Sequence, residues 1–356
     1  MVKFCCFFVV AVCVASASQE DITPRIGAIE VYGTHHVSPE KIKSTLNLKP
    51  GAPLPSRADS EERLDKLSGV VASRIEAICC SGRNPVLYIG IEERNEPHIE
   101  YHSAPSVEFT LPKEIADKYQ AVIDAAAASI RAKNADEDLT NGYSLMADPE
   151  ARQLQQSLVP LVDANLASVD KVLRESSDAD QRAAAAYVIQ YGPRSVRASK
   201  TIADALQYAI QDSDETVRKN AMISLRAVMV GARLHPEQQI HIEPTWFVEL
   251  MNSVVWSDRH NASLALLTLT DKHNPEALDL LRSRALQSVV EMARWHDLSH
   301  ALPGFILAGR LAGMDEKDIQ AAWLSGQREP VLQKAEFPNR KHSGITGLTR
   351  RNSKKD

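Results

Sequence analysis

Three arginines recur at a nearly constant spacing in the second half of the sequence, and this repeat constrains the fold more than any other feature. Arg182, Arg218 and Arg259 stand about 40 residues apart, the length of units that stack into solenoids. Within the unit DETVRKNAMISLRAV, apolar residues follow one another at helical intervals and so share one stripe. A single unit cannot bury such a stripe alone. The sequence therefore predicts an all-α solenoid of stacked helices.

The unit that begins at Asp214 resembles a HEAT repeat, whose helix reads Asp-x-x-Val-Arg-x-x-Ala-x-x-x-Leu. The matching residues are Asp214, Val217, Arg218, Ala221 and Leu225. The resemblance implies a HEAT-like helical repeat domain over about residues 150–325. Because Asp212 and Asp214 precede the helix, we expect them to cap it, and we expect Arg218 to pair with an acid of the preceding turn.

In the segment before the helical part, the spacing of the apolar residues predicts, in order, a strand, two helices and two strands. Alternating apolar residues end at Gly33, and Ser38-Pro39 is a typical helix start. Pro50-Gly51 breaks that helix, and alternation returns after a second one. The expected elements are a strand over 26–32, a short helix from Pro39, a helix over about 56–67, and a hairpin of strands over 74–80 and 86–94.

This order resembles a polypeptide-transport-associated (POTRA) domain, and the resemblance covers about residues 22–95. The residues that carry it are Ile26, Ile29, Val31, Gly33, Ser38, Ile42, Leu46, Leu48, Gly51, Ile89, Ile91 and Glu92. The fold class expected for the whole chain is thus a small α+β domain followed by an α-solenoid. The resemblance implies a role in cell-envelope assembly or transport. No outer-membrane barrel is expected after this domain, since the remaining chain lacks repeated alternating strands.

A small sheet of this kind leaves strand edges whose backbone groups can pair with an extended segment of a partner. We therefore expect the protein to bind protein partners by β-augmentation, with the concave face of the solenoid as a second surface for protein, peptide or polysaccharide. The strand-edge segments expected to bind a partner contain Ile29, Val31, Leu87, Ile89 and Ile91.

The first residues have the layout of a signal peptide. Lys3 precedes an apolar run, and Ala15-Ser16-Ala17 supplies a small-x-small cleavage site. The run is shorter than the roughly 20 residues that span a bilayer. We expect residues 1–17 to be removed and the mature protein to be soluble, in the periplasm or outside the cell.

Two cysteines, Cys79 and Cys80, follow the signal segment and are adjacent. Neighbouring side chains of a strand point to opposite faces, so one buried and one exposed thiol is the expected arrangement. A vicinal or an intermolecular disulfide remains as an alternative, because an oxidising compartment favours pairing.

Two segments lie outside the expected small domain and the expected helical repeats. Residues 96–149 are expected to form a linker and one helix from Lys113 to Ala132. Residues 335–356 are basic and are expected to form a disordered tail. With a net charge of −5, the chain has no overall basic footprint, so no nucleic-acid partner is expected. Contact of the tail with a polyanion or a lipid surface is an alternative function.

The string WHDLSH is the most enzyme-like part of the sequence. His296 and His300 stand four apart on an expected helix, with Asp297 beside the first, so both imidazoles would face one side and resemble half of a zinc site. A metal-dependent enzyme is therefore an alternative. The favoured interpretation is a non-catalytic scaffold with no metal and no cofactor, since a third ligand is missing and His35 and His36 fall in a turn.

Overall fold

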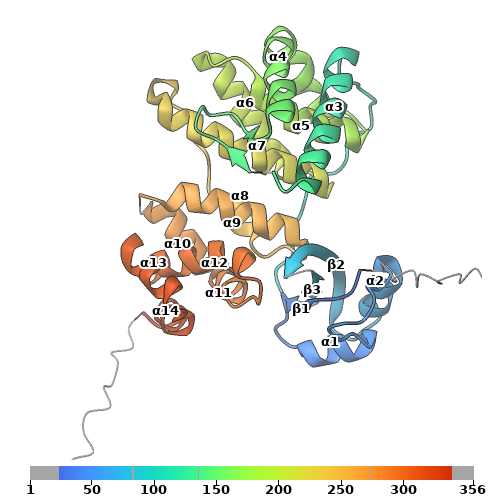
Figure 1. Cartoon of the computed structure of the whole chain (residues 1–356), viewed down its shortest axis with the longest axis vertical. Coiled ribbons are helices and arrows are strands. Elements are labelled where there is room, and N and C mark those ends of the chain that lie inside the picture. Colours follow the sequence, from blue (N-terminus) through green and yellow to red (C-terminus); the bar gives the residue numbers. More distant parts are fainter. Residues whose placement is uncertain (1–23, 82–83, 135, 273, 339–356) are drawn as a thin grey trace, which may run out of the picture.

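The computed structural model describes residues 24–338 except 82–83, 135 and 273, and the side chains of Cys80 and Ser81. Two parts are visible in Figure 1: a small sheet with two helices at the N-terminal end, and a long curved array of helices. The expected combination of a small α+β domain and a helical solenoid is thus confirmed. None of the helices in the described ranges is long and apolar enough to cross a membrane.

The small domain has the expected element order. Its elements are β1 (Ala28–Tyr32), α1 (Pro39–Leu46), α2 (Arg57–Asp65), β2 (Val70–Ser81) and β3 (Asn84–Glu93). Ser38 caps α1 by accepting the N–H of Lys41, and Ser56 caps α2. The strand order is β1-β3-β2, with β1 parallel and β2 antiparallel to β3. One face of the sheet packs on α1 and α2 and buries Ile42, Leu64 and Ile89.

The helical part follows, and its described residues form one further sheet, the short hairpin of β4 (Glu137–Asp138) and β5 (Leu145–Met146). Its helices are α3 (Lys113–Arg131), α4 (Pro149–Glu175), α5 (Ala179–Val188), α6 (Val196–Ala209), α7 (Glu215–Leu234), α8 (Thr245–Leu250), α9 (Trp256–Thr270), α10 (Pro275–Arg284), α11 (Leu286–Ala293), α12 (Leu298–Leu311), α13 (Glu316–Leu324) and α14 (Arg328–Glu336). Two short 3-10 helices, η1 (Ile189–Tyr191) and η2 (Pro236–Gln238), lie between them.

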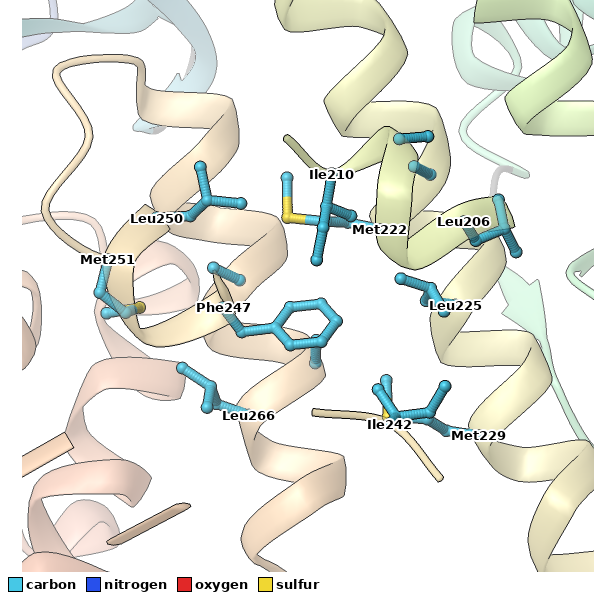
Figure 2. Packing of buried hydrophobic residues seen from close by; sticks show 14 of the residues in the cluster. Leu206, Ile210, Met222, Leu225, Met229, Ile242, Phe247, Leu250, Met251 and Leu266 are labelled. Atoms are coloured by element: carbon cyan, nitrogen blue, oxygen red, sulfur yellow. The ribbon is translucent and has the colours of Figure 1, made fainter. Parts of the chain in front are cut away.

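The apolar stripe expected on α7 forms the centre of the solenoid core. Val217, Ala221, Leu225 and Val228 are all buried. Figure 2 shows side chains of α6, α7, α8 and α9 pointing toward one another around Phe247. Asp214 caps α7 as expected, because its carboxylate accepts the N–H groups of Thr216 and Val217. Neighbouring helices therefore bury the stripe of each unit jointly.

The recurring arginines form a buried ladder that links successive repeats. Arg182 binds Asp212 at 2.7 Å, and Arg218 binds Asp258 at 2.7 Å. Arg259 continues the row by binding Glu291 at 2.8 Å. The expected pairing of Arg218 with an acid of the preceding turn is wrong, because in that turn its guanidinium donates only to the backbone carbonyls of Asp212 and Ser213. Each arginine thus joins the turn before its helix to the acid of the next repeat.

The segment expected to be a linker lies extended along the turns of the solenoid. The N–H of His102 donates to the carbonyl of Gln211, and the carbonyl of Val107 accepts the N–H of Ser177. The Tyr101 ring lies 4.1 Å from the guanidinium of Arg218. Residues 98–111, called the strap below, therefore fasten the small domain to the repeats.

Several expectations concern the ends of the chain and the cysteines. The expected tail boundary is wrong at its start, because Ala335 is fully buried in α14. The signal segment and residues 339–356 lie outside the described residues. Cys79 is exposed and forms a disulfide bond, so the expected free thiol is wrong at this position. The helical repeats also continue beyond residue 325, through α14.

Candidate functional site

The position of β3 decides which strand edges are open to a partner. Leu87, Ile89 and Ile91 lie on β3, which pairs with β1 on one side and with β2 on the other. Their side chains are also buried beneath α1 and α2. The expectation that the segment containing these residues forms a strand edge is therefore wrong, since β1 covers one side of β3 from Val86 to Gly90 and β2 covers the other.

The outer edge of β1 is open over its second half. Ile26 exchanges backbone hydrogen bonds with Gly51 and Ala52, which cover the start of this edge. Because alternate residues of a strand point to opposite sides, the backbone groups of Ala28 and Glu30 face the same outer side as those of Ile26. In the described part of the chain, no hydrogen bond occupies them. Ile29 and Val31 lie on this strand and are half-buried.

A cleft of about 570 Å³ follows this open edge. The side chains of Glu30 and Val31 point to opposite faces of the sheet, so a cleft that touches both residues passes along the edge of the strand. We call it the β1 cleft. Its lining residues are Glu30, Val31, Leu286, Gln287, Val290, Glu291, Arg294, Trp295, Glu336 and Phe337. Its lining thus comes from β1, α11 and the end of α14, which all lie in the lower half of Figure 1.

The opposite edge of the sheet is partly closed. The N–H of Ile75 on β2 points away from β3, toward the outer edge, and donates to the carboxylate of Glu61 at 2.9 Å. Ser73 also donates to Asp65 of α2 at 2.7 Å. A side-chain cap of this kind blunts an edge strand. Of the two edges, β1 is therefore the better acceptor for an added strand.

The second face of the sheet packs on the solenoid through an aromatic junction. The ring centroids of Tyr32 and Tyr88 lie 5.7 and 4.9 Å from that of Trp295. The Tyr32 hydroxyl donates to the carbonyl of Val254 at 2.7 Å, and the Tyr88 hydroxyl bonds His300 Nδ1 at 2.7 Å. Because aromatic contact and buried hydrogen bonds act together, the sheet is fixed against the repeats.

Carboxylates of the sheet and of α11 complete this junction. Glu30 accepts the N–H of His296, and Glu76 accepts the N–H of Trp256. Burial raises the pKa of both glutamates, against the opposing effect of these N–H donors. Glu291 accepts the N–H of Gly33 and pairs with Arg259. These carboxylates tie β1 and β2 to three separate points of the solenoid.

The proposed pair of metal ligands does not form. His296 is exposed and precedes α12, whereas His300 lies within the helix and is buried. Asp297 between them is the N-cap and accepts the N–H groups of Ser299 and His300. The expectation of one shared helix face is wrong, because the helix begins only after His296. No cluster of potential metal ligands occurs among the described residues.

The backbone, rather than the imidazoles, explains the turn that contains His35 and His36. The N–H groups of His35, His36 and Val37 all donate to the carboxylate of Glu93. Burial raises the pKa of Glu93, but these donors outweigh it and leave the pKa lowered. His36 is 71% exposed and lies 3.7 Å from Glu96. The turn thus anchors the end of β3.

Half-buried His260 and buried His300 should make stability pH-dependent. Burial, with smaller effects of His300 and Arg226, lowers the pKa of His260 to about 4, and burial also lowers that of His300. These histidines therefore bind protons at a higher pH in the unfolded chain than in the folded chain. The free energy of unfolding should fall as the pH drops from about 6.5 toward 4. We expect His260→Phe, which keeps the stacking on Trp256, to remove up to about 2.5 kcal/mol of the loss between pH 7 and 4.5.

Urea titrations of both proteins at several pH values measure this difference. All other titrating groups are present in both proteins, so their contributions cancel in the difference between the two pH curves. Parallel curves for wild type and His260→Phe would contradict the assignment.

The sequence alone missed the side of the cleft that α11 and α14 provide. Leu286, Val290 and Trp295 are ordinary apolar residues of a helical pattern, and they follow β1 by more than 250 residues. Only Phe337, 47% exposed, departs from that pattern. Nothing in the local periodicity connects these residues with β1, because that connection depends on how the domain docks.

Comparisons with known proteins complete the description. No family model matches the sequence, and no curated protein matches it. Two solved structures are weakly similar. A computationally designed armadillo repeat protein for modular peptide recognition has a TM-score of 0.35 and 14% identity, covering 53% of this chain and 92% of its own. A second designed armadillo repeat protein has a TM-score of 0.33 and 16% identity, covering 53% and 93%. Similarity this low does not assign a family or a function.

Proposed function

We propose that this protein is an exported, non-catalytic scaffold that binds an extended segment of a protein partner along the open edge of β1. The observation that carries the proposal is the coincidence of unpaired backbone groups at Ala28 and Glu30 with the β1 cleft. Strand addition needs such an edge for main-chain hydrogen bonds and adjacent pockets for side chains. Val31, Leu286 and Phe337 supply an apolar surface beside it.

The sequence supports the setting of this function. Residues 1–17 have the layout of a signal peptide, and residues 22–95 resemble a POTRA domain. The observed order β1-β3-β2, with two helices on one face, is compatible with that resemblance. We therefore propose a role in cell-envelope assembly or transport. The solenoid, with its HEAT-like unit, would hold the small domain in a fixed orientation and provide a second binding surface.

Proline substitution on β1 distinguishes binding of a partner at the outer edge of this strand from the pairing of its inner edge that folding requires. The N–H of Ala28 faces outward, so Ala28→Pro should leave the sheet folded, because edge strands tolerate proline where the N–H is unpaired. It should weaken binding of an added strand by about tenfold or more through loss of one main-chain hydrogen bond and a steric clash. The measurement is selection of extended peptides from a display library on the wild-type chain, followed by titration against both proteins.

Ile29→Pro is the matched control, because the N–H of Ile29 faces β3 and its loss should unfold the small domain. Selected peptides that bind Ala28→Pro as tightly as wild type would show that they do not use this edge. A library that yields no ligand dependent on Ala28 would remove the proposed function.

A further inference from the structure

The described chain ends inside the β1 cleft. Glu336 is the last residue of α14, and both Glu336 and Phe337 line the cleft. Residue 339 follows Phe337 by two positions along the chain. An extended chain advances about 3.3 Å per residue, so roughly eight residues reach about 26 Å, more than the length of a five-residue strand. The tail needs no long connection to reach the whole edge.

The charges of the cleft and of the tail are opposite. Three carboxylates, those of Glu30, Glu291 and Glu336, line the cleft beside Arg294. Arg259 already pairs with Glu291, so the carboxylates exceed the arginines around the cleft by one. Glu30 is half-buried and this partial burial raises its pKa, so a nearby cation would stabilise its charged form. The charged residues of the tail are Arg340, Lys341, Arg350, Arg351, Lys354, Lys355 and Asp356. A strongly basic segment is thus attached directly to an acidic cleft.

Between its basic pairs the tail carries the uncharged stretch SGITGLT, residues 343–349. Ile345 and Leu348 are its apolar residues, and threonine favours extended structure. Because these two residues stand three apart, they would point to opposite sides of an extended chain, so one of them would face Leu286 in the wall of the cleft. The basic residues on either side would then lie near the carboxylates at the rim.

We propose that residues 339–356 bind in cis in the β1 cleft, with residues 343–349 along the outer edge of β1. This inference rests on the proposed function, because it assigns a second occupant to the same cleft. Attachment to α14 gives the tail a high effective concentration at the site. An external strand must then displace the tail, so the tail sets a threshold for partner binding.

Hydrogen exchange of the full chain tests this occupant. Variant Arg340→Glu/Lys341→Glu/Arg350→Glu/Arg351→Glu reverses the charge of the tail at four positions. In wild type the outward N–H groups of Ala28 and Glu30 should exchange about tenfold more slowly than in this variant. A synthetic peptide of residues 339–356, added to the variant, should restore the slow exchange, and added salt should weaken it.

A matched pair of variants tests the acidic rim. Glu336 and Glu329 both pair with Arg294, but only Glu336 lines the cleft. Glu336→Gln should accelerate exchange at Ala28 and Glu30, whereas Glu329→Gln should not. If both variants accelerated exchange equally, the cause would be the loss of an ion pair with Arg294 and not the loss of a carboxylate from the cleft. This result would contradict the inference.

Two further outcomes would overturn the inference. Exchange at β1 that is identical in wild type and the charge-reversal variant, without binding of the synthetic peptide, would show that the tail does not occupy the cleft. Protection that increases with protein concentration would place the tail on a second copy instead. Display selection on the charge-reversal variant separates this failure from that of the proposed function, because peptides dependent on Ala28 would still be selected there.

Discussion

Replacing Arg218 by methionine should lower the free energy of unfolding by about 3 to 5 kcal/mol. The substitution leaves Asp258, which is fully buried, without its guanidinium partner. Burial already raises the pKa of Asp258 against the opposing effect of Arg218. Only the Ser253 hydroxyl at 2.8 Å and the more distant Tyr101 hydroxyl would remain as donors. Urea denaturation, followed by circular dichroism, measures the loss.

Two variants control this experiment. Arg218→Met/Asp258→Leu removes both charges and should recover most of the lost stability, because no unpaired ion remains. Arg284→Met breaks the exposed pair with Glu249 and should change stability by at most about 1 kcal/mol. If Arg218→Met cost no more than Arg284→Met, the buried ladder would not be what joins successive repeats.

Replacing Gly90 by alanine should lower the free energy of unfolding by about 3 kcal/mol. A Cβ at this position would lie 2.0 Å from the carbonyl oxygen of Val254 and 2.8 Å from the Tyr32 hydroxyl. Because the nearest atom belongs to the backbone, the turn around Val254 would have to move away from the sheet. The hydrogen bond from Tyr32 to that carbonyl would break with it. Tryptophan fluorescence should then report solvent at Trp295.

Gly231→Ala is the matched control for this prediction. Gly231 lies within α7, and a Cβ there would meet its nearest neighbour at 3.7 Å, an ordinary contact. Alanine is favoured over glycine in a helix by about 1 kcal/mol, so this variant should be neutral or more stable. A Gly90→Ala protein as stable as wild type would mean that the sheet does not approach Val254 so closely.

Local features of the fold could be predicted from the sequence because each rests on a few neighbouring residues. Ser38-Pro39 starts α1, Gly33 adopts a positive φ of 74° after β1, and the stripe of α7 is buried. The spacing of the arginines also predicted the repeats. The partner of Arg218 could not be found in this way, because Asp258 belongs to the next repeat and only stacking brings it near.

The candidate site could be predicted only in part. Alternation placed Ile29 and Val31 on a strand, and that strand does form an edge. The same pattern on β3 was interpreted in the same way, although β3 pairs on both sides. Periodicity within a strand gives the face of each side chain but not the order of strands in the sheet. The parallel pairing of β1 with β3, across two helices, decides that order.

The strap shows a second limit of local interpretation. The linker predicted before Lys113 indeed contains no helix and no long strand. Its hydrogen bonds go to the turns of the repeats, at Ser176 and Gln211. Because these partners lie about 70 to 110 residues away, their contribution is absent from any local pattern.

The most direct test of the account is hydrogen exchange along β1 in the presence of a peptide selected on this protein. The charge-reversal variant of the tail is the suitable background, since it removes the proposed competitor for the cleft. Bound peptide should slow exchange at Ala28 and Glu30 by about tenfold or more and should leave exchange at Ile75 of β2 unchanged. Protection at the β2 edge or on the repeats, with Ala28 and Glu30 exchanging as before, would contradict it.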